Sequence, residues 1–372
     1  MMLVEIQNTQ TEIKPMPKRT TDENYLERTA PNICPPDKTV QLGLDDGYAC
    51  TKLALENGRL LSIPSRARIG HSGVTWMQDD QQQIFEYQTH GQVYSVGAVD
   101  GEPTHFDGYP VSDMNRVIVQ HAFQQAGLSG QLLRVVSGLP VSAFYSHSGE
   151  RRTETIKQKI QSLKVETQGL GGASAPLPAC VAFHDVIPEA LAAWYDYVIV
   201  EKEDGATLDQ ARLDAPVAIV DIGGRTTDYV VVQDQGIVHG SSGSLNRGLL
   251  DVKTQVAHSI QDAFDLTTVS EQRVALALES NTIRLHGKEH DVSALIQIAR
   301  QELVERLYTE TRRLLGQGAE LDQILFVGGG SAALAQHIAD WFPNQLIAAH
   351  PAYSNARGML KYLQYVCDES VL

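Results

Sequence analysis

Cysteine is scarce in this chain of 372 residues, and its four cysteines are scattered without a CxxC pair. This spacing argues against a zinc site and against a disulfide framework, so a reducing cytoplasm is the expected compartment. No apolar run approaches the ~18–20 residues that a membrane-spanning helix needs, so no membrane partner is expected. The first 15 residues carry Glu5 and Glu12 and lack an apolar stretch, which argues against a secretory signal.

Basic residues are also in deficit: 30 Lys and Arg stand against 45 Asp and Glu, which gives a net charge of -15. Direct binding of nucleic acid or of an anionic membrane needs a cationic face, so neither is expected. The 42% apolar and 20% charged residues are ordinary for a soluble globular protein. The length predicts two domains or one split domain.

Residues 1–38 are poor in large apolar side chains and contain prolines at positions 15, 17, 31, 35 and 36. This composition predicts a flexible N-terminal tail. A docking arm is the alternative interpretation.

From residue 39 onward, apolar residues alternate in short runs that predict strands and hairpins. "TVQLGLDDG" (39–47) predicts a strand that ends in an acidic turn. Two further strands are expected within residues 50–67, joined at Asn57-Gly58, because Asn-Gly is a strong hairpin signal. The pattern then predicts a hairpin over 83–97 around His90-Gly91, a helix over 114–125 stopped by Gly127, and a strand over 132–140.

The second half repeats this plan. "APVAIVDIGG" (215–224) predicts a strand, and residues 226–238 predict a hairpin that turns near Asp234 to Gly236. A long amphipathic helix is expected over 295–315, and residues 321–342 predict strand, glycine turn and helix. Two halves that each open with an acidic hairpin predict a duplicated α/β unit facing itself across a cleft.

Three glycine turns follow apolar strands: "LDDGYACTK" (44–52), "DIGGRTTD" (221–228) and "VGGGSAAL" (327–334). Glycine lets backbone N–H groups face an anion such as phosphate. Asp45 and Asp221 would repel phosphate directly, so they suggest a magnesium ion and its waters in between. Lys52 could return to the phosphates as a point charge, and the helix opened by "GGGSAAL" would favour a nucleotide at its N-terminus.

Each turn taken alone has an ordinary explanation as a hairpin or as a strand–helix joint, and Asp45 could simply cap a turn. "HGKEH" (286–290) has histidines four apart, but Gly287 predicts a hairpin loop there and not a metal site. The combination, order and spacing of the three turns carry the interpretation.

This order of motifs resembles the actin-like ATPase superfamily, which includes the Hsp70 nucleotide-binding domain and the sugar kinases. "LDDGYACTK" resembles the first phosphate hairpin, "AIVDIGGRTTDY" the second and "ILFVGGGSAAL" the adenosine motif, while "VVSGLPVSAFY" (135–145) and "YSNARGMLKYL" (353–363) resemble the two connecting segments. The motif sequences "DDG…K", "GLPV…Y" and "IPEA" most resemble those of the bacterial ParM/StbA plasmid-segregation branch. The resemblance spans residues 40 to 365.

The resemblance implies an α/β fold of two actin-like domains, with duplicated mixed sheets around a nucleotide cleft. Domain I would comprise residues 39–190 with the helix of 352–368 packed back on it, and domain II residues 191–351. It implies ATP, with GTP as an alternative, and Mg²⁺ held through water by Asp45 and Asp221. The residues expected around the nucleotide are Asp46, Gly47, Lys52, Gly223, Gly224, Thr226, Thr227, Gly328, Gly329, Gly330 and Ser331.

Glu189 in "DVIPEALAAW" matches the glutamate that this branch uses to orient the attacking water, so the expected catalytic residues are Glu189, Asp45 and Asp221. The alternative for Glu189 is an acid in a helix first turn after Pro188. Tyr48 stands where the family has a serine or threonine, which puts that hydroxyl contact in doubt. Arg225 could pair with phosphate, although a solvent-facing arginine is the commoner outcome at a hairpin tip.

The resemblance implies an ATPase that polymerises head to tail into a filament and segregates plasmid DNA. A separate ParR-like adaptor would bind the DNA, so the partners are further copies of the chain and this adaptor. The alternatives are a small-molecule kinase or phosphatase of the same fold, and a cell-shape or pilus scaffold homologous to actin.

Overall fold

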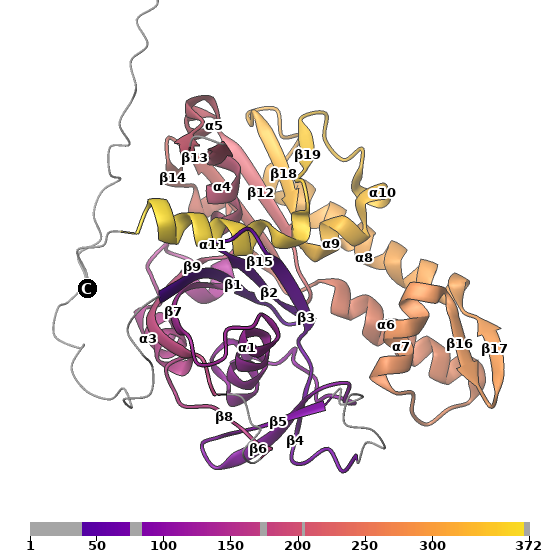
Figure 1. Cartoon of the computed structure of the whole chain (residues 1–372). Helices are drawn as coiled ribbons and strands as arrows, with labels where there is room; N and C mark the ends of the chain where they lie inside the picture. The colour runs from indigo at the N-terminus through magenta and orange to yellow at the C-terminus, as the bar shows by residue number, and fades with distance from the viewer. Residues whose placement is uncertain (1–38, 75–83, 172–176, 203–204, 368–372) are drawn as a thin grey trace, which may run out of the picture.

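The computed structural model describes residues 39–74, 84–171, 177–202 and 205–367 (Figure 1). The predicted tail of residues 1–38 lies outside these ranges. Figure 1 shows two sheet-centred halves, with helix α11 (Ser354–Tyr365) lying across the molecule between them. Within the described ranges, no helix combines the length and the apolar character needed to cross a membrane.

The first half is built on a five-stranded sheet, here called the N-terminal sheet. Its strands are β1 (Thr39–Asp46), β2 (Cys50–Leu55), β3 (Leu60–Pro64), β7 (Leu132–Leu139) and β9 (Cys180–Pro188), in the order β3-β2-β1-β7-β9. β1, β2 and β3 are antiparallel, whereas β7 and β9 continue the sheet parallel to β1. The expected turn joins β2 to β3, and Gly58 takes a φ of 80° there, which favours glycine.

A smaller sheet lies beside the N-terminal sheet. Its strands are β4 (Ala67–Ile69), β5 (Ile84–Thr89), β6 (Gln92–Gly97) and β8 (Gln168–Gly169), and β5 and β6 form the expected hairpin around His90-Gly91. Helix α1 (Asp113–Gln125) begins after Ser112, whose hydroxyl accepts a hydrogen bond from the Asn115 amide. One side of α1 buries Val117 and Ile118 against this small sheet, and the other packs on the N-terminal sheet.

The second half repeats the plan, as the sequence pattern predicts. Its C-terminal sheet contains β12 (Val217–Ile222), β13 (Thr227–Gln233), β14 (Gly236–Ile237), β15 (Gly243–Leu245), β18 (Gln323–Val327) and β19 (Gln345–Ile347). β12 pairs antiparallel with β13 and parallel with β18, just as β1 pairs with β2 and with β7. β12 is buried along its whole length because both faces of the sheet are covered.

An outer group of elements covers one face of the C-terminal sheet and projects to one side in Figure 1. It consists of α6 (Leu249–Phe264), α7 (Glu271–Ser280), β16 (Thr282–Leu285), β17 (Lys288–Asp291) and α8 (Ser293–Leu315). Their apolar side chains join those of the sheet in one core. The expected long helix is α8, and the "HGKEH" segment forms the β16–β17 hairpin as predicted.

Helices α4 (Leu191–Val198) and α11 cross in close contact between the two sheets. A Cβ atom on Gly358 would collide with the backbone of Ala192, so only glycine allows this approach. Arg357 and Lys361 of α11 both donate to the Asp196 carboxylate of α4, at 2.6 and 2.8 Å. The other elements in the part of the chain that the structure describes are α2 (Val141–Phe144), α3 (Thr153–Ser162), β10 (Ile199–Lys202), β11 (Gly205–Leu208), α5 (Gln210–Asp214), α9 (Gly328–Ala333), α10 (Ala335–Ile338) and the 3-10 turns η2 (Tyr109–Val111), η4 (His239–Ser241) and η5 (Pro351–Tyr353).

Candidate functional site

The two sheets carry carboxylates at corresponding positions. Asp45 lies near the end of β1 and Asp221 near the end of β12, and both are almost fully buried, at 5% and 4% exposure. The charge of Asp45 is one of the causes that raise the pKa of Asp221. Such repulsion requires proximity, so the two aspartates share one site although they come from different halves of the chain.

Lys52 is the cation paired with Asp45. The two residues are cross-strand partners in the β1–β2 hairpin, and Lys52 Nζ donates to Asp45 Oδ2 at 2.8 Å. Burial alone would lower the pKa of Lys52, but the carboxylates of Asp45 and Asp221 raise it above its usual range. Lys52 therefore carries its positive charge within the site.

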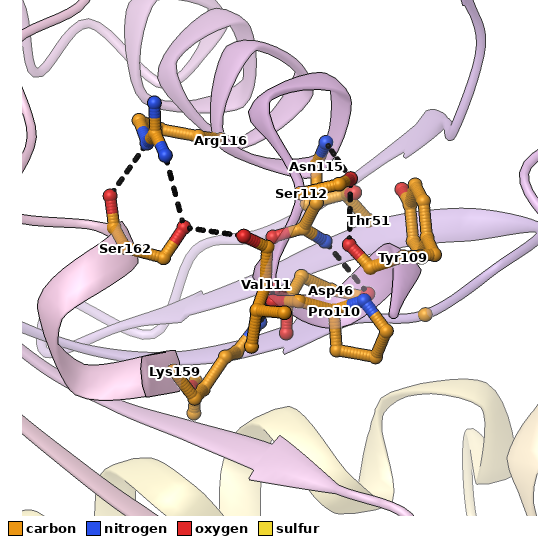
Figure 2. Close-up of polar contacts among 12 residues, drawn as sticks. Asp46, Thr51, Tyr109, Pro110, Val111, Ser112, Asn115, Arg116, Lys159 and Ser162 are labelled. Carbon is orange, nitrogen blue, oxygen red and sulfur yellow. Dashed lines mark hydrogen bonds and ion pairs between the residues drawn. The ribbon is translucent and has the colours of Figure 1, made fainter. Parts of the chain in front are cut away.

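The Asp46 carboxylate lies close enough to this site for its charge to act on Glu189, but it has a cation of its own. It is held by the buried ammonium group of Lys159 on α3, which also donates to the carbonyl oxygen of Pro110 at 2.7 Å (Figure 2). The Asn115 side chain on α1 contacts both residues: its Nδ2 donates to the backbone carbonyl oxygen of Asp46 at 3.4 Å, and its Oδ1 accepts from Lys159 Nζ at 3.4 Å. The Asp46 side chain is thus a structural anchor for the hairpin, and any contact with a ligand is left to its backbone.

Asp221 is fixed from two sides. Asn355 at the start of α11 donates its side-chain amide to Asp221 Oδ2 at 2.7 Å. On the other side, Gly328 has a φ of 86°, and a Cβ atom there would collide with Asp221 Oδ1. Burial, followed by repulsion from Asp45 and Asp228, raises the pKa of Asp221 to about 7.

Glu189 follows the last residue of β9 and precedes α4. It does not lie in the first turn of that helix, which begins at Leu191, so the alternative of an acid in a helix first turn is wrong. Ala190, between them, has a φ of 60° and donates its N–H to Asn355 Oδ1 at 3.2 Å. Burial, followed by the charges of Asp228, Asp45, Asp221 and Asp46, raises the pKa of Glu189 well above its ordinary value.

The expected glycines divide into packed and open positions. Side chains on Gly224, Gly328 and Gly330 would collide with Ala49, Asp221 and Ile222, so these glycines permit close packing of the turns. Gly47 and Gly223 sit in the two hairpins, where a Cβ atom would press on the carbonyls of Cys50 and Thr226. A Cβ atom on Gly329 would meet nothing within 4 Å, so its backbone borders open space.

The expected hydroxyl groups are engaged within the protein. Thr226 donates to Asp228 Oδ2 at 2.8 Å, Thr227 donates to the Arg247 carbonyl at 2.9 Å, and Ser331 donates to the Val327 carbonyl at 2.5 Å. A ligand would therefore meet backbone N–H groups at these turns.

Three residues of the site were not expected from the sequence: Asn355, Asp228 and Lys159. Asp228 is buried and accepts the Val141 amide at 2.8 Å, so it connects β13 to the segment after β7. Its position in "DIGGRTTD" was the only sequence signal. Asn355 and Lys159 reach the site from α11 and α3, and no local pattern marks either.

Tyr48 and Arg225 lie at the tips of the two hairpins. The Tyr48 ring packs against Tyr109, with centroids 5.2 Å apart. Burial, followed by the charge of Glu189, raises the pKa of Tyr48 to about 12, so its hydroxyl stays protonated. Arg225 does not face solvent, the commoner outcome for such a position: its side chain is 19% exposed and pairs with Asp107 at 2.5 Å.

The donor set fits a hydrated divalent cation. Asp45, Asp221, Asp228 and Glu189 converge, and repulsion among them contributes to the raised pKa of Asp221 and of Glu189. A cation accompanied by a phosphate ligand would relieve that excess of negative charge. Among the described residues, no group of three or more His, Cys, Asp or Glu side chains is arranged to hold a metal ion directly.

Comparison with known proteins identifies two family models. The model described as plasmid segregation protein ParM, N-terminal, matches residues 40–198. The model described as archaeal actin homologue MreB-like, C-terminal, matches residues 219–340. No curated protein matches the sequence significantly.

Solved structures of actin-like proteins share the fold. A non-polymerisable quadruple mutant of pCBH ParM is 18% identical, with a TM-score of 0.70, covering 88% of this chain and 99% of that one. A 15-stranded ParM filament from Clostridium botulinum is 17% identical, with a TM-score of 0.68 and the same coverage. An archaeal actin homologue in complex with ADP is 19% identical, with a TM-score of 0.66 and again 88% and 99% coverage. The expected two-domain actin-like fold is confirmed.

Proposed function

This chain is an actin-like protein of the ParM-like branch, and on that premise we propose that it is an ATPase that polymerises head to tail and segregates plasmid DNA. The observation that carries the proposal is one buried site that joins the two halves: Asn355 contacts both the Asp221 carboxylate and the backbone N–H of Ala190, next to Glu189. The charge of Asp45 acts on both acids. We place the nucleotide between a domain of residues 39–190, completed by the helix of 352–368, and a domain of residues 191–351.

Backbone N–H groups would bind the phosphates in this proposal. Gly47 and Gly223 lie in hairpins whose threonine hydroxyls are already engaged, so the β- and γ-phosphates would meet amide donors. Lys52 would add a positive charge beside them, because it is held against Asp45. Gly329 borders open space and would let the adenosine approach the backbone of α9.

Asp45 and Asp221 would hold Mg²⁺ through its water ligands, and the ion would neutralise phosphate charge. Asn355 and Gly328 keep the Asp221 carboxylate in one orientation, since the first donates to one oxygen and the second lies against the other. We propose ATP as the nucleotide, with GTP as the alternative.

Glu189 would orient the water that attacks the γ-phosphorus as the bond to the β-phosphate oxygen breaks. A carboxylate does this by accepting a hydrogen bond from the water, and it must be ionised to accept the water's proton. Because burial and four neighbouring aspartates raise the pKa of Glu189, the hydrolysis rate should increase as the pH rises through that pKa.

Self-assembly follows from the premise: a head-to-tail contact that does not close into a ring produces a filament. A ParM relative is solved as a filament, which supports this proposal. The net charge of -15 is consistent with a motor that leaves DNA binding to a separate ParR-like adaptor in the cytoplasm.

Light scattering and phosphate release, measured with ATP, ADP and a slowly hydrolysed analogue, test the function. Glu189→Ala should bind ATP and polymerise but release phosphate about 10²–10⁴-fold more slowly, the usual contribution of such a residue. Glu320→Ala, at an exposed position on the turn before β18, is the matched control and should behave as wild type. Phosphorylation of an added sugar without any polymer would instead identify a kinase and overturn the proposal.

A further inference from the structure

Arg225 connects the tips of the two hairpins. It follows Gly224 in the turn between β12 and β13, yet its side chain contacts residues from the first half of the chain. The guanidinium group lies 5.1 Å from the centroid of the Tyr48 ring, in the turn between β1 and β2. Its Nη2 also donates to Asp107 Oδ1 at 2.5 Å.

The segment before α1 holds the first partner of Arg225, Tyr48, in place and contains the second, Asp107. Thr104 donates its hydroxyl to the Tyr48 carbonyl at 2.5 Å. The Tyr48 ring packs on Tyr109, which in turn meets Phe106 edge to face at a centroid distance of 5.8 Å. Asp107 belongs to the same segment, between Phe106 and Tyr109 in the sequence, but its side chain is 99% exposed, so packing positions the ring and not the carboxylate.

The hairpin backbones also approach each other at this point. A Cβ atom on Gly224 would collide with the Cβ atom and the amide nitrogen of Ala49, the residue after Tyr48. The tips are therefore in contact beside the acidic site, and Arg225 adds a side chain that spans them.

We propose that Tyr48, Arg225 and Asp107 form a clasp that joins the two hairpins and slows the departure of a bound nucleoside phosphate. The inference rests on the proposed function, since a ligand gripped by both hairpins can leave only after their tips separate. Separation would break the contact between Arg225 and Tyr48 and the ion pair between Arg225 and Asp107. Arg225 is thus a positioning residue for the nucleotide.

The two halves of the clasp contribute unequally. The Asp107 side chain is 99% exposed, so water screens its ion pair with Arg225. The Tyr48 ring is partly buried and covers one face of a guanidinium that is itself mostly buried, which strengthens a cation–π contact. Tyr48 should therefore matter more than Asp107.

Stopped-flow displacement of a fluorescent ADP derivative in the presence of Mg²⁺ measures this departure rate. Arg225→Ala should release the probe about five- to tenfold faster than wild type, since a cation–π contact and an exposed ion pair are lost together. Tyr48→Phe keeps the ring and removes only the hydroxyl that interacts with Arg225, so it should speed release by about threefold or less. Tyr48→Leu removes the ring as well and should approach the Arg225→Ala rate. Asp107→Asn should change the rate by about twofold or less.

Arg313→Ala is the matched control, because it breaks an exposed ion pair with Glu310 on α8, away from the hairpins. Arg225→Lys keeps the charge and should restore part of the slow release, while the Tm of all variants stays close to that of wild type. If wild type binds the probe but Arg225→Ala or Tyr48→Leu releases it no faster, the clasp is refuted and the nucleotide site stands. If wild type binds neither the ADP nor the ATP derivative, the proposed function is refuted, and the clasp proposal is refuted with it.

Discussion

Asp221→Asn should change how the stability of the ligand-free protein depends on pH. Burial and the charges of Asp45 and Asp228 raise the pKa of Asp221 from an ordinary 3.8 to about 7. A carboxyl group whose pKa is higher in the folded than in the unfolded state favours folding while it is protonated. This contribution is complete below the unfolded pKa and disappears as the pH rises through the folded pKa.

The size of the effect follows from the two pKa values, 3.8 and about 7. At 1.36 kcal/mol per pKa unit, the whole difference corresponds to about 4 kcal/mol, of which about 2–3 kcal/mol is lost between about pH 5 and pH 8. Asparagine cannot ionise, and its side-chain oxygen can still accept the hydrogen bond from Asn355. The variant should therefore lose much less stability over this interval than wild type does.

Urea denaturation at about pH 5 and about pH 8, with magnesium and nucleotide absent, measures the free energy of unfolding in each condition. Asp340→Asn, at an exposed position after α10, is the control and should follow the wild-type pH dependence. Parallel pH profiles for wild type and Asp221→Asn would show that Asp221 does not sit in a repulsive acidic site. That result would refute the claim that Asp45 and Asp221 share one site, and the proposed function would lose its main support.

Two further changes test how the site is built. Lys159→Met leaves the buried Asp46 carboxylate without its cation (Figure 2), so urea denaturation should show a loss of about 3–5 kcal/mol; a loss below about 1 kcal/mol would contradict the anchoring role of this pair. Gly328→Ala should lower stability by about 1–3 kcal/mol, because φ is 86° and the new methyl group meets Asp221. Gly329→Ala, beside open space, should keep the wild-type stability but weaken binding of the fluorescent ATP derivative, and unaltered binding would place the ligand elsewhere.

Much of the fold could be predicted because its signals are local. The Asn57-Gly58 turn, the hairpin around His90-Gly91 and the helix that became α8 each depend on residues within one short window. The repetition of an acidic hairpin also indicated that β1 and β12 are equivalent, and the sheets confirm it. Short strands such as β8 and β15 were not predicted, because two or three residues give no periodic pattern and their pairing depends on the neighbouring strand.

The site was predictable only where chemistry coincides with a turn motif. Asp45 and Asp221 follow apolar strands and precede glycines, so their place at corresponding sheet ends could be read from the chain. Asn355 lies 134 residues from the aspartate that it contacts, and Lys159 lies 113 residues from Asp46. An asparagine or a lysine on a helix is ordinary in sequence, and only the tertiary structure gives either a partner in this site.

Arg225 shows why local preference fails at such a site. At a hairpin tip in isolation, an arginine side chain gains most by staying in water, which is why solvent exposure is the usual outcome. Here the tip of the first hairpin carries Tyr48 in place of a small hydroxyl residue, and the guanidinium group of Arg225 makes a cation–π contact with its ring. The one departure from the family pattern, Tyr48, thus explains the position of Arg225: an aromatic ring on one hairpin and a cation on the other are complementary only when the halves of the chain meet. If Tyr48 and Arg225 act as one unit, their double variant should release nucleotide no faster than Arg225→Ala alone, because the second change removes a contact that is already lost.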